Sequence, residues 1–537
     1  MTQHSTLLIL DYGSQYTQLI ARRVREMGVY SFIIPGDSKL ERIQSYNPKA
    51  VILSGGPSSV YDLDAPTLPA GLLEDQKKKK YPILGVCYGM QLLVRELGGK
   101  VEKAKKREYG RMPIEIAKES GFFKSLSDKG ILSPNVWMSH GDETKAIPAG
   151  FRLTAKSKEG AVAAMESESE RIYGLQFHPE VTHTESGKEM LARFIHDIAG
   201  FGSDWSMQSV LDEQVEKVRA KVGPTAHVIC ALSGGVDSAV AAALVHQAVG
   251  DRLHCVFVDN GLLRFDEQKR VMGMFKDKLH LPVICVDASE RFLSKLKGVA
   301  DPEKKRKIIG AEFIAVFDDA AKEISKKVGH TPEFLVQGTL YPDVIESSPP
   351  PGSISELGSG RKHSATIKSH HNVGGLPKDM KFQLIEPLRD LFKDEVRALG
   401  KVLGVPADFL KRHPFPGPGL AVRVIGDVYF EALEILRHVD EIFISSIREA
   451  GLYDQIWQAF AVFLPIRSVG VQGDGRTHDH VVALRAVGST DGMTADWYPF
   501  SSEFLAKVSS KICNEVRGVN RVVYDVSSKP PATIEWE

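Results

Sequence analysis

The sequence has few cysteines and no long apolar run. Its 537 residues include five cysteines, an odd number without paired spacing, which argues against a disulfide framework and for a reducing compartment. No apolar stretch approaches the roughly 20 residues that a membrane-spanning helix needs. The stretch MTQHSTLLILDYG has no basic region before its apolar run, so no secretory signal is predicted. We therefore expect a cytoplasmic protein without a membrane partner.

The sequence also has no excess of positive or of negative charge. Lys+Arg and Asp+Glu both number 68, and the formal net charge is zero. A polyanionic partner such as nucleic acid is therefore not indicated. With 43% hydrophobic and 25% charged residues, the composition is that of a folded globular protein. At roughly 150 residues per domain, the length suggests three or four domains.

The order of apolar and polar stretches predicts three domains, at 7–204, 205–405 and 406–537. In the first two, short apolar strands alternate with amphipathic helices, which predicts the α/β class with two doubly wound, mainly parallel sheets. Cys230, Cys255 and Cys285 fall in stretches of the second domain that we expect to be buried strands. The third domain begins near RHPFPGPGL and is predicted to be smaller and α+β.

A candidate nucleophile, Cys87, lies in YPILGVCYGMQLL, where a predicted buried strand turns into a helix. Gly85 and Gly89 flank it, which is the spacing of the G-x-S-x-G elbow with Cys in place of Ser. The helix amino terminus favours a reactive thiolate. The alternative is a buried structural cysteine.

Candidate partners for this thiol come from IYGLQFHPE and LSGGPSS. His178 and Glu180 are two residues apart, so on an extended segment they project to the same side. Glu180 could then orient the ring of His178 while this ring takes the thiol proton. Gly55 and Gly56 follow another predicted strand and could offer N–H groups to an oxyanion. His-Pro-Glu by itself would be an ordinary strand end.

A second glycine-rich turn, SGGVDS, connects a predicted strand to an Ala-rich helix. Such a turn offers backbone N–H groups to phosphate at the positive end of the helix dipole. It lacks the Lys of a G-x-x-x-x-G-K-[ST] loop. A carboxylate near phosphate requires a cation between them, so Asp237 is a candidate Mg²⁺ ligand when phosphate is bound. The residues of this turn that could meet phosphate are Ser233, Gly234, Gly235, Val236, Asp237 and Ser238.

These motifs resemble two known families. GVCYGMQLL, QFHPE and SGGP together resemble class I glutamine amidotransferases, which hydrolyse glutamine through a thioester and release ammonia. The resemblance implies Cys87 as nucleophile, His178 as base and Glu180 as its orienting partner. SGGVDS resembles the loop of N-type ATP pyrophosphatases, which hold the β- and γ-phosphates as they leave together. The resemblance implies that residues 233–238 hold ATP or pyrophosphate, with Mg²⁺ bound together with ATP. That family also implies Lys381, in DMKFQLIEPL, as a contact to ATP phosphates.

The order of these domains, with a small third domain last, resembles the GMP synthetase family over essentially the whole chain. The family stretches include DNGLLR, HPFPGPGLAVRV and KPPATIEWE. The resemblance implies adenylylation of xanthosine monophosphate (XMP) by ATP and amination by ammonia from glutamine. It also implies a homodimer through the third domain. The residues it implies for XMP binding are Arg306, Gln472, Lys529, Ile534 and Glu535.

Three expectations stay open at this point. Arg306 lies on a predicted helix that begins with Asp301 as N-cap and Pro302 in the first turn, and could equally belong to a solvated basic face. The stretch 347–377 is either a lid over a substrate or a surface insertion. The alternative function is a glutaminase whose ATP domain only senses nucleotides.

Overall fold

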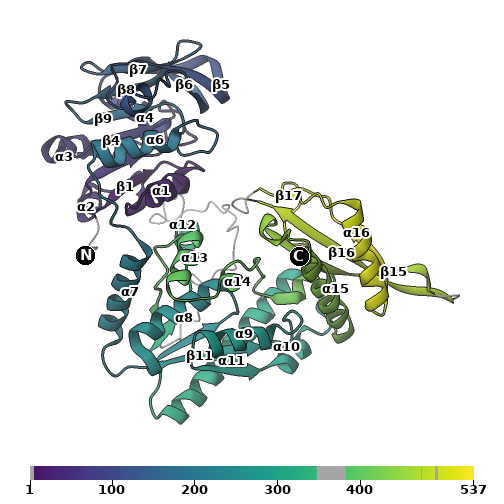
Figure 1. Cartoon of the computed structure of the whole chain (residues 1–537). Helices are drawn as coiled ribbons and strands as arrows, with labels where there is room; N and C mark the ends of the chain where they lie inside the picture. Colours follow the sequence, from purple (N-terminus) through teal and green to yellow (C-terminus); the bar gives the residue numbers. More distant parts are fainter. Residues whose placement is uncertain (1–4, 348–381, 473–474, 490–493) are drawn as a thin grey trace. The chain divides into compact units, whose positions relative to one another are not determined.

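The computed structural model describes residues 5–347, 382–472, 475–489 and 494–537 (Figure 1). Lys381 and almost all of the stretch 347–377 lie outside the described residues. The chain divides into two compact units, with the division between Val210 and Leu211. Within the described residues, no helix has the length and the apolar character needed to cross a membrane.

The first unit is built on a single sheet. Its strands are β1 (Leu7–Asp11), β2 (Ser31–Pro35), β3 (Ala50–Leu53), β4 (Ile83–Val86), β5 (Lys100–Ile116), β6 (Asn135–Ala146), β7 (Arg152–Ser157), β8 (Val162–Ser167) and β9 (Ile172–Leu175). Its helices are α1 (Thr17–Glu26), α2 (Leu40–Ser45), α3 (Leu72–Lys79), α4 (Tyr88–Glu96), α5 (Lys124–Ser127), α6 (Gly187–Ala192) and η1 (Arg193–Ile198).

This sheet has the strand order β2-β1-β3-β4-β9-β8-β7-β5-β6. The strands from β2 to β9 in this order are parallel, and β1, β3 and β4 are apolar runs buried on both faces, as a helix-covered parallel sheet requires. The remaining strands pair antiparallel. The predicted parallel sheet is therefore confirmed for the half that follows the strand–helix alternation, and the antiparallel half was not predicted.

The second unit begins within helix α7 (Met207–Val222), which spans the division between the units. Its strands are β10 (Val228–Leu232), β11 (Leu253–Asp259), β12 (Val283–Asp287), β13 (Phe334–Val336), β14 (Gln383–Ile385), β15 (Gln458–Gln472), β16 (Gly475–Gly488), β17 (Asp496–Trp497) and β18 (Val519–Tyr524). Its helices are α8 (Val236–Val249), η2 (Gly250–Arg252), α9 (Glu267–Gly273), η3 (Met274–Lys278), α10 (Ser289–Leu296), α11 (Pro302–Val328), α12 (Tyr341–Ser347), α13 (Lys393–Val402), α14 (Ala407–Leu410), η4 (Gly419–Arg423), α15 (Phe430–Glu449), η5 (Tyr453–Gln455) and α16 (Ser502–Glu515).

Two sheets organise the second unit. The first has the all-parallel order β12-β11-β10-β13-β14. The second combines the long hairpin β15–β16 with β17 and with β18, which lies parallel to β16. One buried apolar cluster extends from Ile229 and Val256 of the first sheet to Val482 and Val519 of the second. The residues before and after position 405 therefore share a core. The boundary between 405 and 406 stays a prediction.

The prediction that PVICVD is a buried strand was wrong. The strand β12 exists, but it lies at the edge of its sheet. Ile284 is 42% exposed, and Cys285 is only partly buried. An apolar run indicates that a segment forms a strand. How much of the strand is buried depends on the elements that pack against it. Cys230 and Cys255, on the two adjacent strands, are buried as predicted.

Candidate active sites

Cys87 lies in the strained turn that its flanking glycines predict. The residue connects β4 to α4 with φ +52° and ψ −108°, a conformation that a non-glycine residue rarely adopts. A Cβ on Gly85 would lie 2.7 Å from the backbone of Gly89, and one on Gly89 would collide with the carbonyl of Leu53. Both positions therefore need glycine, because strand and helix meet at backbone contact. The predicted elbow is confirmed.

The order of the strands brings the other residues to this turn. In the parallel part of the sheet, β4 lies between β3 and β9, and carboxyl ends of parallel strands share one edge. Cys87 follows β4, Gly55 follows β3, and His178 follows β9. A Cβ on Gly55 would lie 3.0 Å from Cε1 of His178. The glycine turn predicted to stabilise an oxyanion therefore lies against the imidazole ring.

His178 has a carboxylate on one ring nitrogen and the thiol as a further partner. Its Nδ1 lies 2.8 Å from Oε1 of Glu180, and both side chains are buried. Burial by itself would lower the pKa of His178, but the negative charge of Glu180 and the hydrogen bond with Cys87 raise this pKa well above its usual value. The three residues can therefore act as nucleophile, base and orienting carboxylate.

Backbone contacts fix the segment that carries His178 and Glu180. The amide of His178 donates to the carbonyl of Trp137 at 3.0 Å, and the hydroxyl of Thr184 donates to the carbonyl of His178 at 2.6 Å. Nε of Arg23 donates to the carbonyl of Glu180 at 3.1 Å. The base is thus held by partners from β6, α1 and the turn before α6.

Sequence reasoning missed the residues on the other side of the thiol. Nε2 of Gln176 lies 3.7 Å from Sγ of Cys87, and this sulfur lies 3.6 Å from the carbonyl of Ser139 on β6. Nε2 of Gln91 donates to Oε1 of Gln176 at 3.3 Å. Gln91 lies inside GVCYGMQLL and Gln176 inside IYGLQFHPE, so their positions in these motifs could have indicated them. Ser139 comes from the antiparallel strands, which no local pattern connects with Cys87.

The SGGVDS loop in the second unit is closed by its own hydroxyl groups. Oγ of Ser233 and Oγ of Ser238 lie 3.1 Å apart, and the amide of Gly235 donates to Oγ of Ser233 at 3.3 Å. Oγ of Ser238 also donates to the carbonyl of Gly235 at 3.1 Å. Val236 begins the 14-residue helix α8. The loop thus presents the amino terminus of a long helix, as a phosphate site requires.

A lysine that the sequence analysis missed reaches this loop from α13. Nζ of Lys393 lies 2.6 and 2.7 Å from the two carboxylate oxygens of Asp237. The two residues are 156 positions apart, so no spacing within the loop could indicate the pair. The loop lacks the lysine of a Walker sequence, yet the fold brings a lysine to it.

The residues at the loop fit a magnesium ion that arrives with nucleotide. Mg²⁺ is usually held by one or two carboxylates together with phosphate oxygens and water. Asp237 offers the carboxylate, and a cationic group already lies against both its oxygens. Within the described part of the chain, no cluster of three or more His, Cys, Asp or Glu side chains could hold a metal by itself. Phosphates would thus have to complete the ligand set.

Of the residues predicted to bind XMP, Arg306, Ile534 and Glu535 lie at the last turn of the chain. Asp301 caps α11 by accepting from the amide of Lys304 at 2.8 Å, which confirms the predicted helix start. From this helix, Nη2 of Arg306 donates to the carbonyl of Glu537 at 2.6 Å. Lys529 pairs through its backbone with Ala495. The side chain of Gln472 and all of Lys381 lie outside what the structure describes.

Glu535, which the resemblance implies in XMP binding, has protein partners on both oxygens. Arg423 donates to its carboxylate twice, at 2.8 and 3.1 Å, and Gln458 donates once, at 2.7 Å. The carbonyl of Ile534 accepts from Nε of Arg485 at 2.7 Å. The final residues are therefore held by hydrogen bonds of both their side chains and their backbone.

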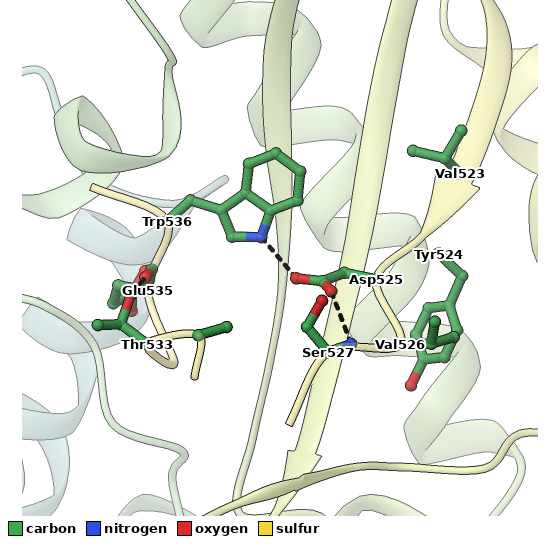
Figure 2. A pocket seen from close by; sticks show the side chains of 9 residues that line it. Val523, Tyr524, Asp525, Val526, Ser527, Thr533, Glu535 and Trp536 are labelled. Atoms are coloured by element: carbon green, nitrogen blue, oxygen red, sulfur yellow. Dashed lines mark hydrogen bonds between the residues drawn. The ribbon is translucent and has the colours of Figure 1, made fainter. Parts of the chain in front are cut away.

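Beside this tail lies an open cavity of about 550 Å³ (Figure 2). Val523 and Tyr524 line it from β18, and Thr533, Glu535 and Trp536 line it from the tail. Nε1 of Trp536 donates to Oδ2 of Asp525 at 2.9 Å, and the amide of Ser527 donates to Oδ1 of Asp525 at 2.9 Å (Figure 2). The cavity offers an aromatic wall beside carboxylate and hydroxyl groups.

Comparison with known proteins places each segment in a described family. Residues 8–198 match the class I glutamine amidotransferase family, residues 226–282 the HUP domain of tRNA methyl transferases, and residues 445–536 the GMP synthase C-terminal domain. A glutamine-hydrolysing GMP synthase of Rhodopseudomonas palustris is 55% identical over 99% of this chain and 95% of its own length. Its counterpart in Chlorobium phaeovibrioides is 56% identical over 99% of this chain and 100% of its own length.

Proposed function

Because the chain belongs to the glutamine-hydrolysing GMP synthase family and makes GMP from XMP, ATP and glutamine, we propose how its residues divide that reaction. Cys87, His178 and Glu180 hydrolyse glutamine. The SGGVDS loop, with Lys393, holds the ATP phosphates that leave. The tail Thr533–Glu537, together with Arg306 and Lys529, holds XMP. The observation that carries this division is the buried arrangement of Cys87, His178 and Glu180 at one edge of a parallel sheet.

In the first half-reaction, Sγ of Cys87 attacks the amide carbon of glutamine. His178 takes the thiol proton and returns a proton to the leaving nitrogen, so ammonia departs and a thioester remains. The N–H groups of the turn at Gly55 and Gly56 face the oxygen on which negative charge develops. Water then attacks the thioester with His178 as base, and glutamate is released. Glu180 holds the ring and stabilises its protonated form throughout.

In the second half-reaction, the 2-oxo oxygen of XMP attacks the α-phosphorus of ATP. Pyrophosphate leaves, and the hydroxyls of Ser233 and Ser238 and the N–H groups around Gly235 stabilise its charge. Bound Mg²⁺ would neutralise phosphate charge beside Asp237. Ammonia then attacks C2 of the adenylylated base and AMP leaves, which gives GMP. Lys393, displaced from Asp237, is within reach of the same phosphates.

We also propose that the protein works as a cytoplasmic homodimer through its last domain. Large apolar side chains are exposed along β15: Ile466 (55%), Val469 (48%) and Val471 (77%). Exposed apolar side chains that gather on one region mark interaction surfaces in soluble proteins. A sedimentation mass twice that of the 59.1 kDa chain would support the dimer, and a single-chain mass at micromolar concentration would contradict it.

The division of labour is tested by two substitutions with opposite expected effects. Cys87→Ala should abolish GMP formation from glutamine and retain it from added ammonium salt, because ammonia from solvent bypasses the thioester. Asp237→Asn should abolish AMP and pyrophosphate formation with either nitrogen donor, while basal glutamine hydrolysis continues. GMP is measured for Cys87→Ala, and AMP and pyrophosphate are measured for Asp237→Asn, with XMP present in both assays. A folded Cys87→Ala protein that makes no GMP at any ammonium concentration would overturn the proposal.

A further inference from the structure

Three cationic side chains without any exposed surface converge on the tail Thr533–Glu537. Among the described residues, Lys305, Arg423 and Arg485 are the Lys and Arg residues with 0% exposure. Nζ of Lys305 lies 2.5 Å from Oε2 of Glu537. Arg485 donates to the carbonyls of Thr533 and Ile534 at 2.8 and 2.7 Å. Arg423 binds the carboxylate of Glu535. The tail is thus held by charge-assisted hydrogen bonds, and Ile534 packs against the buried cluster of Phe460, Val462 and Ala483.

Buried ion pairs of this kind are weak evidence for stability. Removing two charges from water costs about as much as their attraction returns, and apolar replacements are often as stable. What such pairs offer is a fixed geometry. The concentration of these cations on five residues therefore indicates a requirement on the conformation of the tail.

Arg423 fixes the side chain of Glu535 in the tail, as Lys305 fixes that of Glu537. Its Nη2 and Nε donate to Oε1 and Oε2 of Glu535 at 2.8 and 3.1 Å. The guanidinium itself cannot turn freely, because its carbon lies 4.2 Å from the ring centre of Phe460 and 5.2 Å from that of Phe415. Asp440 lies 4.0 Å from Nη1 on the remaining side. A planar fork held on three sides sets both the position and the plane of the Glu535 carboxylate.

We propose that Arg423 is a positioning residue for XMP, which acts through Glu535. The inference rests on the proposed function, in which the tail meets XMP. A carboxylate that is already fixed needs no further ordering when the substrate binds, and this preorganisation raises affinity. Lysine cannot replace the arginine, since an ammonium group has neither the fork nor the flat face that packs between the two rings. Gln458 adds one donor to Oε1 of Glu535 and supports the same orientation.

The test compares Arg423→Lys with Arg252→Lys in GMP synthesis from ammonium salt, which leaves the glutaminase site out of the measurement. Arg252 is a matched control, because it is partly buried in the same unit and binds the carbonyls of Gly223 and Ala226 at the amino ends of the parallel strands. Arg423→Lys should raise KM for XMP by about 10- to 100-fold and change KM for ATP by less than about twofold. Arg252→Lys should leave both KM values unchanged.

Two further variants make every result informative. If Arg423→Lys does not fold, Gln458→Leu removes the second donor to Glu535 and should raise KM for XMP by about 3- to 10-fold. Glu535→Gln tests the underlying assignment, because an unchanged KM for XMP in that variant means that Glu535 does not meet XMP at all. A raised KM in Glu535→Gln with unchanged KM in both Arg423→Lys and Gln458→Leu would retain the proposed site and overturn the positioning role. Equal rises in KM for ATP and XMP would also overturn it.

Discussion

At the scale of single residues, two opposing effects determine the charge of His178. The ring is buried, which disfavours the imidazolium, yet the carboxylate of Glu180 and the thiol of Cys87 raise the pKa of His178 well above its usual value. The charged neighbours therefore outweigh burial. In the folded protein the ring keeps its proton at pH values where an exposed histidine has lost it.

This balance predicts the behaviour of Glu180→Gln. Without the carboxylate, burial dominates and the pKa of His178 should fall, which moves the acidic limb of the glutaminase pH profile to lower pH. The rate should also fall by about 10²- to 10⁴-fold, because the base loses its orientation. Imidazole NMR across the titration measures the pKa directly. An unchanged titration of His178 in this variant would show that Glu180 does not control the ring.

The same shift affects stability, with a definite sign. A raised folded-state pKa means that the folded chain binds more protons than the unfolded chain in the interval between the two pKa values. The contribution of His178 to stability is therefore fully present below the unfolded value of about 6.5. It is lost as the pH rises through the folded-state pKa. Glu180→Gln should remove this pH dependence from the unfolding of the first unit.

At the scale of elements, the N-cap of helix α11 determines where the helix begins and thereby positions two cations at the proposed substrate site. Asp301 accepts from the amide of Lys304, and Pro302 occupies the first turn. Lys305 and Arg306 follow directly and bind Glu537. The start of the helix thus fixes where two cations reach the tail. A helix that began one turn later would release both.

Removing the cap should loosen this first turn. Asp301→Ala is expected to cost about 1 kcal/mol of local stability, which corresponds to roughly fivefold faster hydrogen exchange in residues 304–306. Asp301→Asn is the matched control, since asparagine caps as well as aspartate. Exchange measured by mass spectrometry on the two proteins separates the cap from the charge. Equal exchange in the alanine and asparagine variants would contradict the role of the cap.

At the scale of the whole molecule, the two proposed catalytic sites belong to different compact units. Glutamine hydrolysis without an acceptor for ammonia would waste glutamine, so a coupling free energy between the sites would be useful. We expect ATP together with XMP to raise the glutaminase rate by about 5- to 150-fold, the range of typical coupling energies.

The measurement is glutamate release with each nucleotide alone and with both. Cys87→Ala provides the background rate, and Asp237→Asn should abolish the stimulation while its basal rate remains. Identical glutaminase rates with and without both nucleotides would show that the two units work independently.

The sequence by itself determined the features that a short segment encodes. The elbow at Cys87 follows from two glycines around one cysteine, the pair His178 and Glu180 from two-residue spacing, and the SGGVDS loop from a strand, a turn and a helix in succession. Each is a local backbone geometry, and local sterics and hydrogen bonds are enough to specify it. The alternation of strands and helices gave the parallel sheets for the same reason.

Only the tertiary structure decided which distant segments meet. Lys393 reaches Asp237 across 156 positions, and Arg423 reaches Glu535 across 112. The edge position of β12 and the antiparallel half of the first sheet could not be predicted from the sequence either. The physical reason is that strand order and burial depend on which surfaces pack together, and the apolar pattern of one segment does not specify its neighbours. The strained turn at Cys87 could thus be predicted from the motif, whereas the contacts that fix the tail required the fold.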